Sequence, residues 1–315
     1  MNNAFQELTD TSKVRSPFWS EAWERVLTTA FPYIQLRHFV YRGTHAVRVA
    51  QIGDRITSAP FSDGGDVVAL AEAPIELESF RADFIERFGT ESMVRVHEHL
   101  AKVVPTALSA DIIDYHVALK SFSIDSVRKT LRHILDEEMP QGADIRRANI
   151  SETNRVYALY LDTMHEAGGI ALPREAFEDL MHRDVFVFVL KGKIEAASVF
   201  FANEASAYHF ISASSRAGKS VHAPHHILFY AIKQFQQAGE LDLFLGGTNA
   251  SSSLRTFKEG WRGEECKIYT VSGSPACAGR SAHEAARQSP LRALWKLVPT
   301  SLLSKATKLI GKRVF

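Results

Sequence analysis

A predicted β-hairpin in the second half of the chain constrains the fold most. Asp184–Lys191 and Ile194–Ala202 are two apolar, strand-like runs joined at Gly192-Lys193, a pair of residues that suits a tight turn. Tyr208–Ser214 follows as a third strand-like run. The sequence therefore predicts a three-stranded meander that begins with this hairpin.

Helical segments surround the meander. In order, the second half is predicted to contain two helices, the meander, a helix, a strand, a loop and a last strand. The helices are expected at residues 151–167, 173–182 and 225–238, and the later strands at Leu241–Leu245 and Lys267–Val271.

The first half shows a similar succession of elements. Ser16-Pro17 is a typical helix start, and hairpin strands are expected at Ile34–Tyr41 and Ala46–Ile52. A chain of 315 residues exceeds the usual size of one core, so two domains are expected. The predicted divisions are a flexible tail at 1–15, an N-terminal lobe at 16–140, a C-terminal lobe at 141–275 and C-terminal helices at 276–315.

The composition is that of an ordinary soluble protein. Hydrophobic residues make up 45% and charged residues 23%, and the net charge of +1 gives no reason to expect DNA as a partner. The 2 cysteines exclude a disulfide framework and a cysteine-rich zinc module. Because no leader or membrane-spanning run is apparent, a cytoplasmic location is expected.

Four short motifs occur in an order that is more specific than any one of them. They are Ser16–Trp19, the PFSDGG loop Pro60–Gly65, the hairpin Asp184–Ala202, and Leu241–Gly247 followed by Leu254–Trp261, which contains Phe-Lys. In this order they resemble the FemAB/FemX family, over roughly residues 16–271. The PFSDGG loop lacks the aromatic residue that precedes the glycines in that family.

The resemblance implies an α+β fold with mixed sheets, built as two tandem lobes of the GNAT acyltransferase type. It also implies acyl transfer to an amine of a cell-envelope precursor, such as peptidoglycan or polysaccharide. No tightly bound cofactor is needed, because the donor, aminoacyl-tRNA or acyl-CoA, is already activated. Two alternatives stay open: an acetyl-CoA-dependent GNAT N-acetyltransferase, and a non-catalytic binding protein on the same fold.

Lys258 is the strongest candidate for chemistry. Together with Phe257 it matches a pair that lies in the transfer site of the resembled family, where the lysine holds a carboxylate or a developing oxyanion. A solvated surface lysine is the alternative. Asp242 lies in an otherwise apolar strand, so its carboxylate either is paired or faces a cleft as proton acceptor or substrate anchor. A strand-end aspartate that faces solvent or caps the neighbouring turn is the alternative. Asn249, in the following glycine-rich loop, is a candidate for amide contacts or a simple turn residue.

The loop Ser215–Ser220 lies where acetyl-CoA users of the GNAT fold bind a pyrophosphate with backbone N–H groups. Its glycine follows Arg216 at the wrong spacing, so the phosphate-binding pattern is incomplete. Arg216 and Lys219 still place positive charge at a helix start. The loop therefore favours aminoacyl-tRNA or another donor over coenzyme A, without excluding coenzyme A.

Other candidate binding residues are spread over both halves. Tyr208 lies in a predicted central strand, Asp63 and Gly64 match the loop near the acceptor in the resembled family, and Arg146 follows the interlobe segment. The alternative for Tyr208 is a core residue, the alternative for Asp63 and Gly64 is a tight turn, and the alternative for Arg146 is simple surface exposure. The His222–His226 cluster has no carboxylate or cysteine nearby, so no metal site is predicted.

The C-terminal tail is basic and amphipathic. Residues 285–315 contain no acidic side chain, and Pro299 divides them into two short predicted helices. Such helices can lie on an anionic membrane surface, pack on the first lobe or contact the tRNA backbone. Peripheral contact with the inner face of a membrane is therefore one option for the tail.

Overall fold

The predicted hairpin is present as β11 (Asp184–Leu190) and β12 (Lys193–Ala202). Lys191 and Gly192 join the strands with φ angles of +49° and +76°. Two consecutive residues with positive φ match the twist of the paired strands, which explains the tight turn. The computed structural model describes residues 4–62, 65–103, 110, 112–203, 206–239, 241–249, 253–274 and 302–303.

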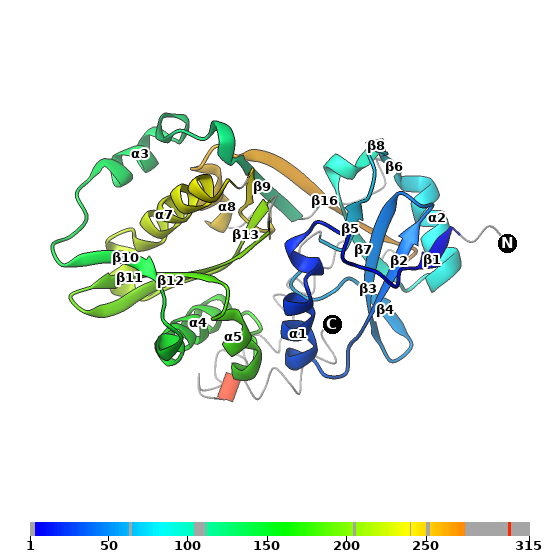
Figure 1. Cartoon of the computed structure of the whole chain (residues 1–315), viewed down its shortest axis with the longest axis horizontal. Helices are drawn as coiled ribbons and strands as arrows, with labels where there is room; N and C mark the ends of the chain where they lie inside the picture. The colour runs from blue at the N-terminus through cyan, green and yellow to red at the C-terminus, as the bar shows by residue number, and fades with distance from the viewer. Residues whose placement is uncertain are drawn as a thin grey trace.

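Nine strands of the described residues form one mixed sheet, which extends from one half of the molecule into the other (Figure 1). Its order is β10 (Ala143–Arg147), β11, β12, β13 (Ser206–Ser214), β14 (Asp242–Phe244), β9 (Ile112–Ala118), β16 (Glu264–Ser272) and β7 (Met93–His97), with β15 (Thr248–Asn249) also paired to β9. Strand β9 comes from the first half of the chain and lies between two strands of the second half. The lobe boundary after residue 140 stays a prediction, but this sheet continues across it.

Helices cover both faces of this sheet, which explains why β11 is apolar from Val185 to Leu190. Val185 and Val187 pack in one core with two helices, and Phe186 and Phe188 pack in another core with a third helix. The helices of this half are α3 (Lys129–Asp136), α4 (Thr153–Ala167), α5 (Arg174–Leu180), α6 (Arg216–Ser220), α7 (Ala223–Ala238) and α8 (Ser253–Glu259). The first core contains α4 and α5, and the second contains α7.

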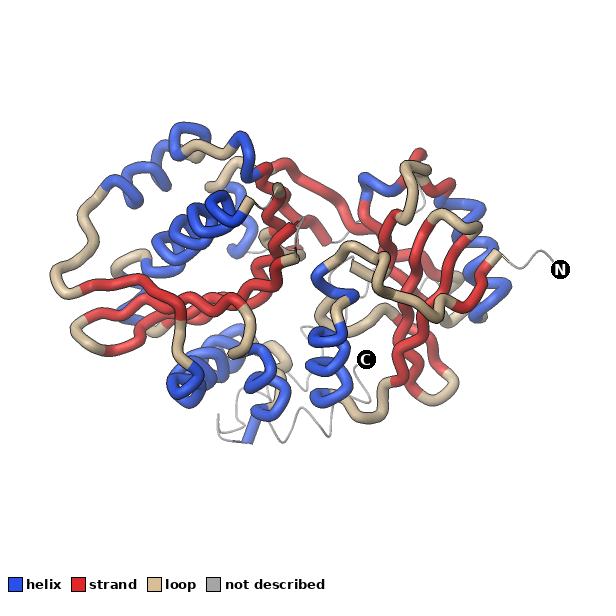
Figure 2. The backbone as a smooth tube through the Cα atoms, in the orientation of Figure 1, coloured by secondary structure: helices blue, strands red, loops and turns tan. Residues whose placement is uncertain are grey.

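A second sheet fills the first half of the molecule (Figure 2). Its described strands are β1 (Phe5–Glu7), β2 (Gln35–Tyr41), β3 (His45–Ile52), β4 (Arg55–Thr57) and β5 (Val67–Ala69), with α2 (Leu77–Phe88) beside them and a separate pair of β6 (Ile75–Glu76) and β8 (Ala101–Val103). The expectation of a flexible tail at 1–15 is corrected for β1. Phe5 is buried against Phe80 and Phe84 of α2 and belongs to the core, whereas Gln6 and Glu7 are exposed.

The opening helix begins later than the sequence suggested. Residues Pro17–Trp19 form a separate 3₁₀ turn, and the helix α1 (Glu21–Ala30) is capped by Ser20, whose hydroxyl accepts from the Trp23 N–H at 3.2 Å. Ser16 makes no capping hydrogen bond through its side chain. Because α1 packs on α5, the two halves share one apolar core. The 3₁₀ turns are η1 (Pro17–Trp19), η2 (Glu98–Leu100), η3 (Leu119–Ser121), η4 (Ile124–Ser126) and η5 (Ile150–Glu152).

Within the described part of the chain, none of the helices combines the length and the apolar character that crossing a bilayer requires. The predicted amphipathic helices at 276–315 lie outside the described residues, apart from Leu302 and Leu303. Leu303 is fully buried and Leu302 is exposed.

Candidate active site

Strands β13 and β14 run parallel for only a short distance and then separate. They are paired from Ser206–Tyr208 to Asp242–Phe244, after which β13 continues to Ser214 alongside β12. On its other side β14 pairs with β9, and this pairing continues after Phe244, where the Leu245 N–H donates to the Tyr115 carbonyl at 2.9 Å. Backbone pairing between β13 and β14 thus ends at Tyr208 and Phe244, just before Gly246 and Gly247.

Gly246 and Gly247 form a short loop that side chains hold from two directions. The Lys258 ammonium group donates to the carbonyl oxygens of Gly246 and Gly247, the latter at 3.2 Å. The Gly247 N–H donates to the Tyr208 hydroxyl at 3.3 Å. Gly246 has φ +84°, and a Cβ there would lie 3.1 Å from the His209 carbonyl oxygen, so glycine is required.

Lys258 is buried, with 3% of its surface exposed, so the alternative of a solvated surface lysine is wrong. Its position on α8 directs the ammonium group to the glycine loop. Phe257 packs against the His225 ring, with centroids 4.7 Å apart. Lys258 is thus hydrogen-bonded to the loop beside Tyr208, and its role at an oxyanion stays a prediction.

A cavity of about 260 Å³ lies between the two halves. Tyr208 and Phe244 line it from the second half, and Phe18 of η1 lines it from the first. Phe18 meets Tyr208 edge-on, with ring centroids 4.5 Å apart. The predicted residue Tyr208 is therefore both a cavity wall and a contact of the glycine loop.

Asp242 is the first residue of β14, and its carboxylate is both paired and partly exposed. Its carboxylate contacts Nε2 of His116 on β9 at 2.7 Å, and the His116 ring stacks on Phe244 at 5.1 Å. The side chains of His116 and Asp242 are 26% and 37% exposed, so solvent and solutes reach the pair. Sequence reasoning missed His116; its alternation with Tyr115 and Val117 in a strand-like run was the available signal.

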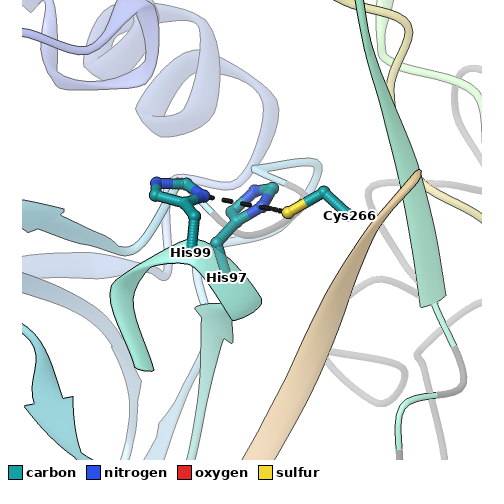
Figure 3. A group of neighbouring side chains, drawn as sticks. All are labelled: His97, His99 and Cys266. Carbon is teal, nitrogen blue, oxygen red and sulfur yellow. Dashed lines mark hydrogen bonds between the residues drawn. The ribbon is translucent and has the colours of Figure 1, made fainter. Parts of the chain in front are cut away.

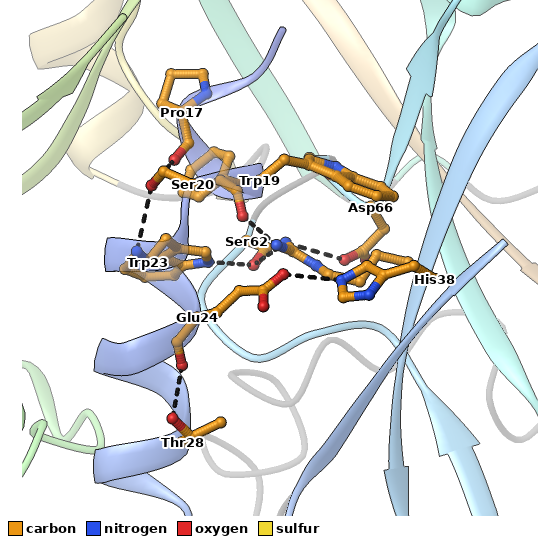
Figure 4. Close-up of polar contacts among 12 residues, drawn as sticks. Pro17, Trp19, Ser20, Trp23, Glu24, Thr28, His38, Ser62 and Asp66 are labelled. Atoms are coloured by element: carbon orange, nitrogen blue, oxygen red, sulfur yellow. Dashed lines mark hydrogen bonds and ion pairs between the residues drawn. The ribbon is translucent and has the colours of Figure 1, made fainter. Parts of the chain in front are cut away.

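The described ends of the PFSDGG loop are anchored by buried polar contacts (Figure 4). Trp23 Nε1 donates to the Ser62 hydroxyl at 3.1 Å, and Arg48 Nη2 donates to the same hydroxyl at 3.0 Å. Arg48 also lies 3.8 Å from Asp66. Asp63 and Gly64 lie outside the described residues, so their predicted role near the acceptor stays a prediction.

The loop Ser215–Ser220 folds as the short helix α6. The Gly218 N–H donates to the Ser215 hydroxyl at 3.0 Å, and a Cβ on Gly218 would lie 2.4 Å from the Glu195 carbonyl oxygen. Lys219 pairs with Glu166 at 2.5 Å, and Arg216 is exposed. The Gly218 N–H is thus engaged within its own turn.

Arg146, another predicted residue, lies away from the cavity. Arg146 is on the edge strand β10 and makes a two-pronged ion pair with Glu152, at 2.8 and 2.7 Å. The side chain of Asn249 lies outside the described atoms, although its backbone forms part of β15. In the histidine cluster, His226 is buried and lies beside Phe188, while His225 contacts Phe257.

His209 is expected to make the protein less stable in acid. Burial, followed by the nearby Lys258 ammonium, lowers its pKa from 6.5 to about 3. Between these values the unfolded chain binds a proton that the folded chain does not, so stability falls as the pH falls, by about 1.4 kcal/mol per pH unit. Urea unfolding of the wild type and H209Q at about pH 7 and about pH 5 measures this dependence.

Glutamine does not take up this proton, so H209Q should lose less stability than the wild type between the two pH values. H133Q alters a histidine on α3 whose side chain is 77% exposed, and it should keep the wild-type dependence. Equal pH dependence in the wild type and H209Q would contradict the prediction.

The cavity also contains residues that sequence reasoning missed. His97, His99 and Asp114 line it, and Cys266 on β16 is the register partner of Asp114 on β9. The available signal was the alternation of His97 and His99 at a strand end. The segments 93–99 and 264–272 are far apart in sequence, so only the strand order brings them together.

No protein-family model and no curated protein sequence matches this chain. Solved structures do match. FemX has a TM-score of 0.59 at 11% identity, with 86% of this chain and 98% of that chain covered. L-PGS from Bacillus licheniformis has a TM-score of 0.51 at 16% identity, with coverages of 83% and 89%. The C-terminal DUF2156 domain of an Agrobacterium fabrum protein has a TM-score of 0.52 at 14% identity, with coverages of 82% and 92%.

At these identities the similarity concerns the fold. In this chain, Tyr208 of β13 and Phe244 of β14 line the cavity at the point where the two strands separate. The chain therefore has the α+β fold of FemX, with two tandem GNAT-like lobes.

Proposed function

We propose that this chain is an acyltransferase that moves an acyl or aminoacyl group to an amine of a cell-envelope or polysaccharide precursor. The observation that carries the proposal is that β13 and β14 separate at Tyr208 and Phe244, which line the cavity, while Tyr208 and Lys258 fix the glycine loop that follows β14. An activated acyl donor needs an aligned amine, a proton acceptor and a stabilised oxyanion. The cavity and its surroundings provide groups suited to each need.

The His116–Asp242 pair is the proposed proton acceptor. Asp242 holds Nε2 of the imidazole at 2.7 Å, and the ring lies on Phe244, which lines the cavity. A carboxylate that orients an imidazole supports general base catalysis, which typically contributes about 10²–10⁴-fold in rate. Tyr208, in the cavity wall, is the proposed group for the developing oxyanion.

The donor is proposed to be aminoacyl-tRNA, with acyl-CoA as the alternative. A pyrophosphate needs successive N–H groups that are open to it. In α6 the Gly218 N–H is engaged by Ser215, and the backbone at Gly218 packs against the Glu195 carbonyl. This arrangement supports a donor that does not depend on the coenzyme A phosphate loop.

The test is a comparison of donors with the purified full chain. We expect charged tRNA to be retained by the protein and to lose its aminoacyl group to an amine acceptor, whereas acetyl-CoA is not bound. Panels of peptide amines and amino-sugar nucleotides would identify the acceptor class. D242N and H116Q should each lower the transfer rate by about 10²-fold or more without preventing donor binding.

A matched control is D144N, which alters a carboxylate on the edge strand β10, away from the cavity. Transfer from acetyl-CoA alone would replace the aminoacyl proposal by the N-acetyltransferase alternative. Full transfer activity in both D242N and H116Q would rule out the proposed proton acceptor. Binding of either donor without transfer to any amine would favour the non-catalytic alternative.

A further inference from the structure

Three side chains with metal-binding atoms converge beside the cavity (Figure 3). His97 lies at the end of β7, His99 lies in η2, and Cys266 lies on β16. They are the one group of three or more such side chains that lies close enough together to hold a metal ion among the residues that the structure describes. The His222–His226 cluster, whose residues are closer in sequence, does not form such a group within that part of the chain.

The strand register explains the convergence. His97 on β7 is the partner of Ile268 on β16, and Cys266 lies two positions before Ile268 on the same face of that strand. The 3₁₀ turn η2 then reverses the chain after His97, so that His99 reaches the same thiol. His97 and Cys266 are buried, with 8% and 9% exposed, whereas His99 is exposed.

The spacing of the donor atoms fits a tetrahedral metal ion. The Cys266 sulfur lies 3.3 Å from Nδ1 of His97 and 3.7 Å from Nδ1 of His99. Zinc with Zn–N bonds of about 2.0–2.1 Å and a Zn–S bond of about 2.3 Å holds its nitrogen and sulfur ligands about 3.5 Å apart. The two observed separations lie on either side of this value, and all three ligand atoms lie within 4.8 Å of one another.

We infer that His97, His99 and Cys266 bind a zinc ion with three protein ligands and a fourth position directed to the cavity. Imidazole and thiolate are the ligands that zinc favours, and three protein ligands with one open position are typical of catalytic zinc sites. His97 and His99 both line the cavity, so an oxygen atom of a bound substrate or water completes the coordination. The ion polarises that oxygen.

This inference replaces the expectation from sequence that no metal site exists. It also goes beyond the proposed function, because it does not depend on the identity of the donor or the acceptor. Cys266 and His97 are separated by 169 positions in the chain, so nothing in the sequence indicated that the thiol joins the two histidines.

The first test is metal content. The full chain, purified without a histidine tag and after dialysis, is expected to retain about one zinc per chain, as a structural or catalytic site does. Cobalt substitution should then give a sulfur-to-cobalt charge-transfer band together with visible bands typical of a tetrahedral site. C266S should lose the charge-transfer band. Removal of an outer-shell partner of a metal ligand typically lowers metal affinity about 10–100-fold, so H99Q, which removes a ligand itself, should lower the zinc affinity by at least this factor.

Matched controls separate this site from other histidines. H133Q on α3 and H222Q, in the histidine cluster, should keep the zinc content and the cobalt spectrum of the wild type. Because His99 is exposed, H99Q is expected to fold even if C266S does not. Circular dichroism checks the fold of each variant.

The inference would be overturned by any of three results. In the first, the wild type holds no zinc after dialysis and its Tm does not rise on zinc addition. The three side chains would then be only a thiol and two imidazoles that are hydrogen-bonded to one another. Cobalt could bind without a charge-transfer band. The metal could also be lost in H222Q but not in C266S or H99Q, which would place it in the histidine cluster.

Discussion

Methionine in place of Arg48 is expected to lower the free energy of unfolding by about 3–5 kcal/mol, because it leaves a buried carboxylate without its cation. The side chains of Arg48 and Asp66 are 0% and 1% exposed, and Nη2 and Oδ1 lie 3.8 Å apart. Arg48 also donates to the Phe18 carbonyl and to the Ser62 hydroxyl. Urea unfolding of R48M against the wild type measures the loss.

This loss should depend on pH. Burial raises the pKa of Asp66 to about 6, against the opposing effect of Arg48, so removal of the guanidinium should raise it further. Between the pKa of the unfolded chain and the higher pKa of the folded chain, the folded chain keeps a proton that the unfolded chain has released. The free energy of unfolding therefore falls as the pH rises through this range. R48M should therefore be destabilised more at about pH 8 than at about pH 5.

The double variant R48M/D66L is the control, because it removes the stranded charge together with its partner. Replacing a buried ion pair by apolar residues of similar size is often neutral, so the double variant should recover much of the stability that R48M loses. If R48M/D66L were as unstable as R48M at every pH, the loss would come from packing at Arg48 and not from the uncompensated charge.

The second large effect is expected at Lys258. K258M should lower the rate of acyl transfer by about 10²-fold, because misplacement of a site by about 1 Å costs this much. Lys258 donates to the carbonyls of Gly246 and Gly247, next to the Tyr208 hydroxyl and the cavity. Methionine fills most of the same volume, so the fold should be retained while the loop loses its two hydrogen bonds.

The fall should appear in kcat, with the KM for the donor little changed, since the loop positions the reacting groups and does not hold the whole donor. K267M is the matched control: Lys267 has a 48% exposed side chain on β16. It should retain the wild-type rate. A K258M enzyme with normal kcat would show that the glycine loop keeps its position without the ammonium group.

Local patterns in the sequence predicted the elements well. The hairpin at Asp184–Ala202 and the helix that ends at Gly239 follow from apolar periodicity and from residues that adopt positive φ, both of which depend on neighbours in the chain. The start of α1 was harder to place, because Ser16 and Ser20 both precede helical residues and only the geometry shows that Ser20 caps.

The candidate site was predicted only in part. Tyr208 and Lys258 were found because short motifs contain them, whereas His97, His99, His116 and Cys266 carry no such motif. Cys266 meets His97 because β16 pairs with β7, and His116 meets Asp242 because β9 pairs with β14. Such strand order is set by long-range packing that periodicity does not report. The partner of Asp242 was missed for the same reason.

Strand β16 has a consequence for how the chain folds during synthesis. Its first residues pair with β9 and its last residues pair with β7, and Tyr269 and Val271 complete the core of the first half. When residues 1–140 leave the ribosome, that core lacks these side chains, and β9 has no partner until the segment from Asp242 onward emerges. Such late, long-range pairing slows folding and leaves strand edges exposed. We therefore expect the nascent first half to require protection from aggregation until the chain is released.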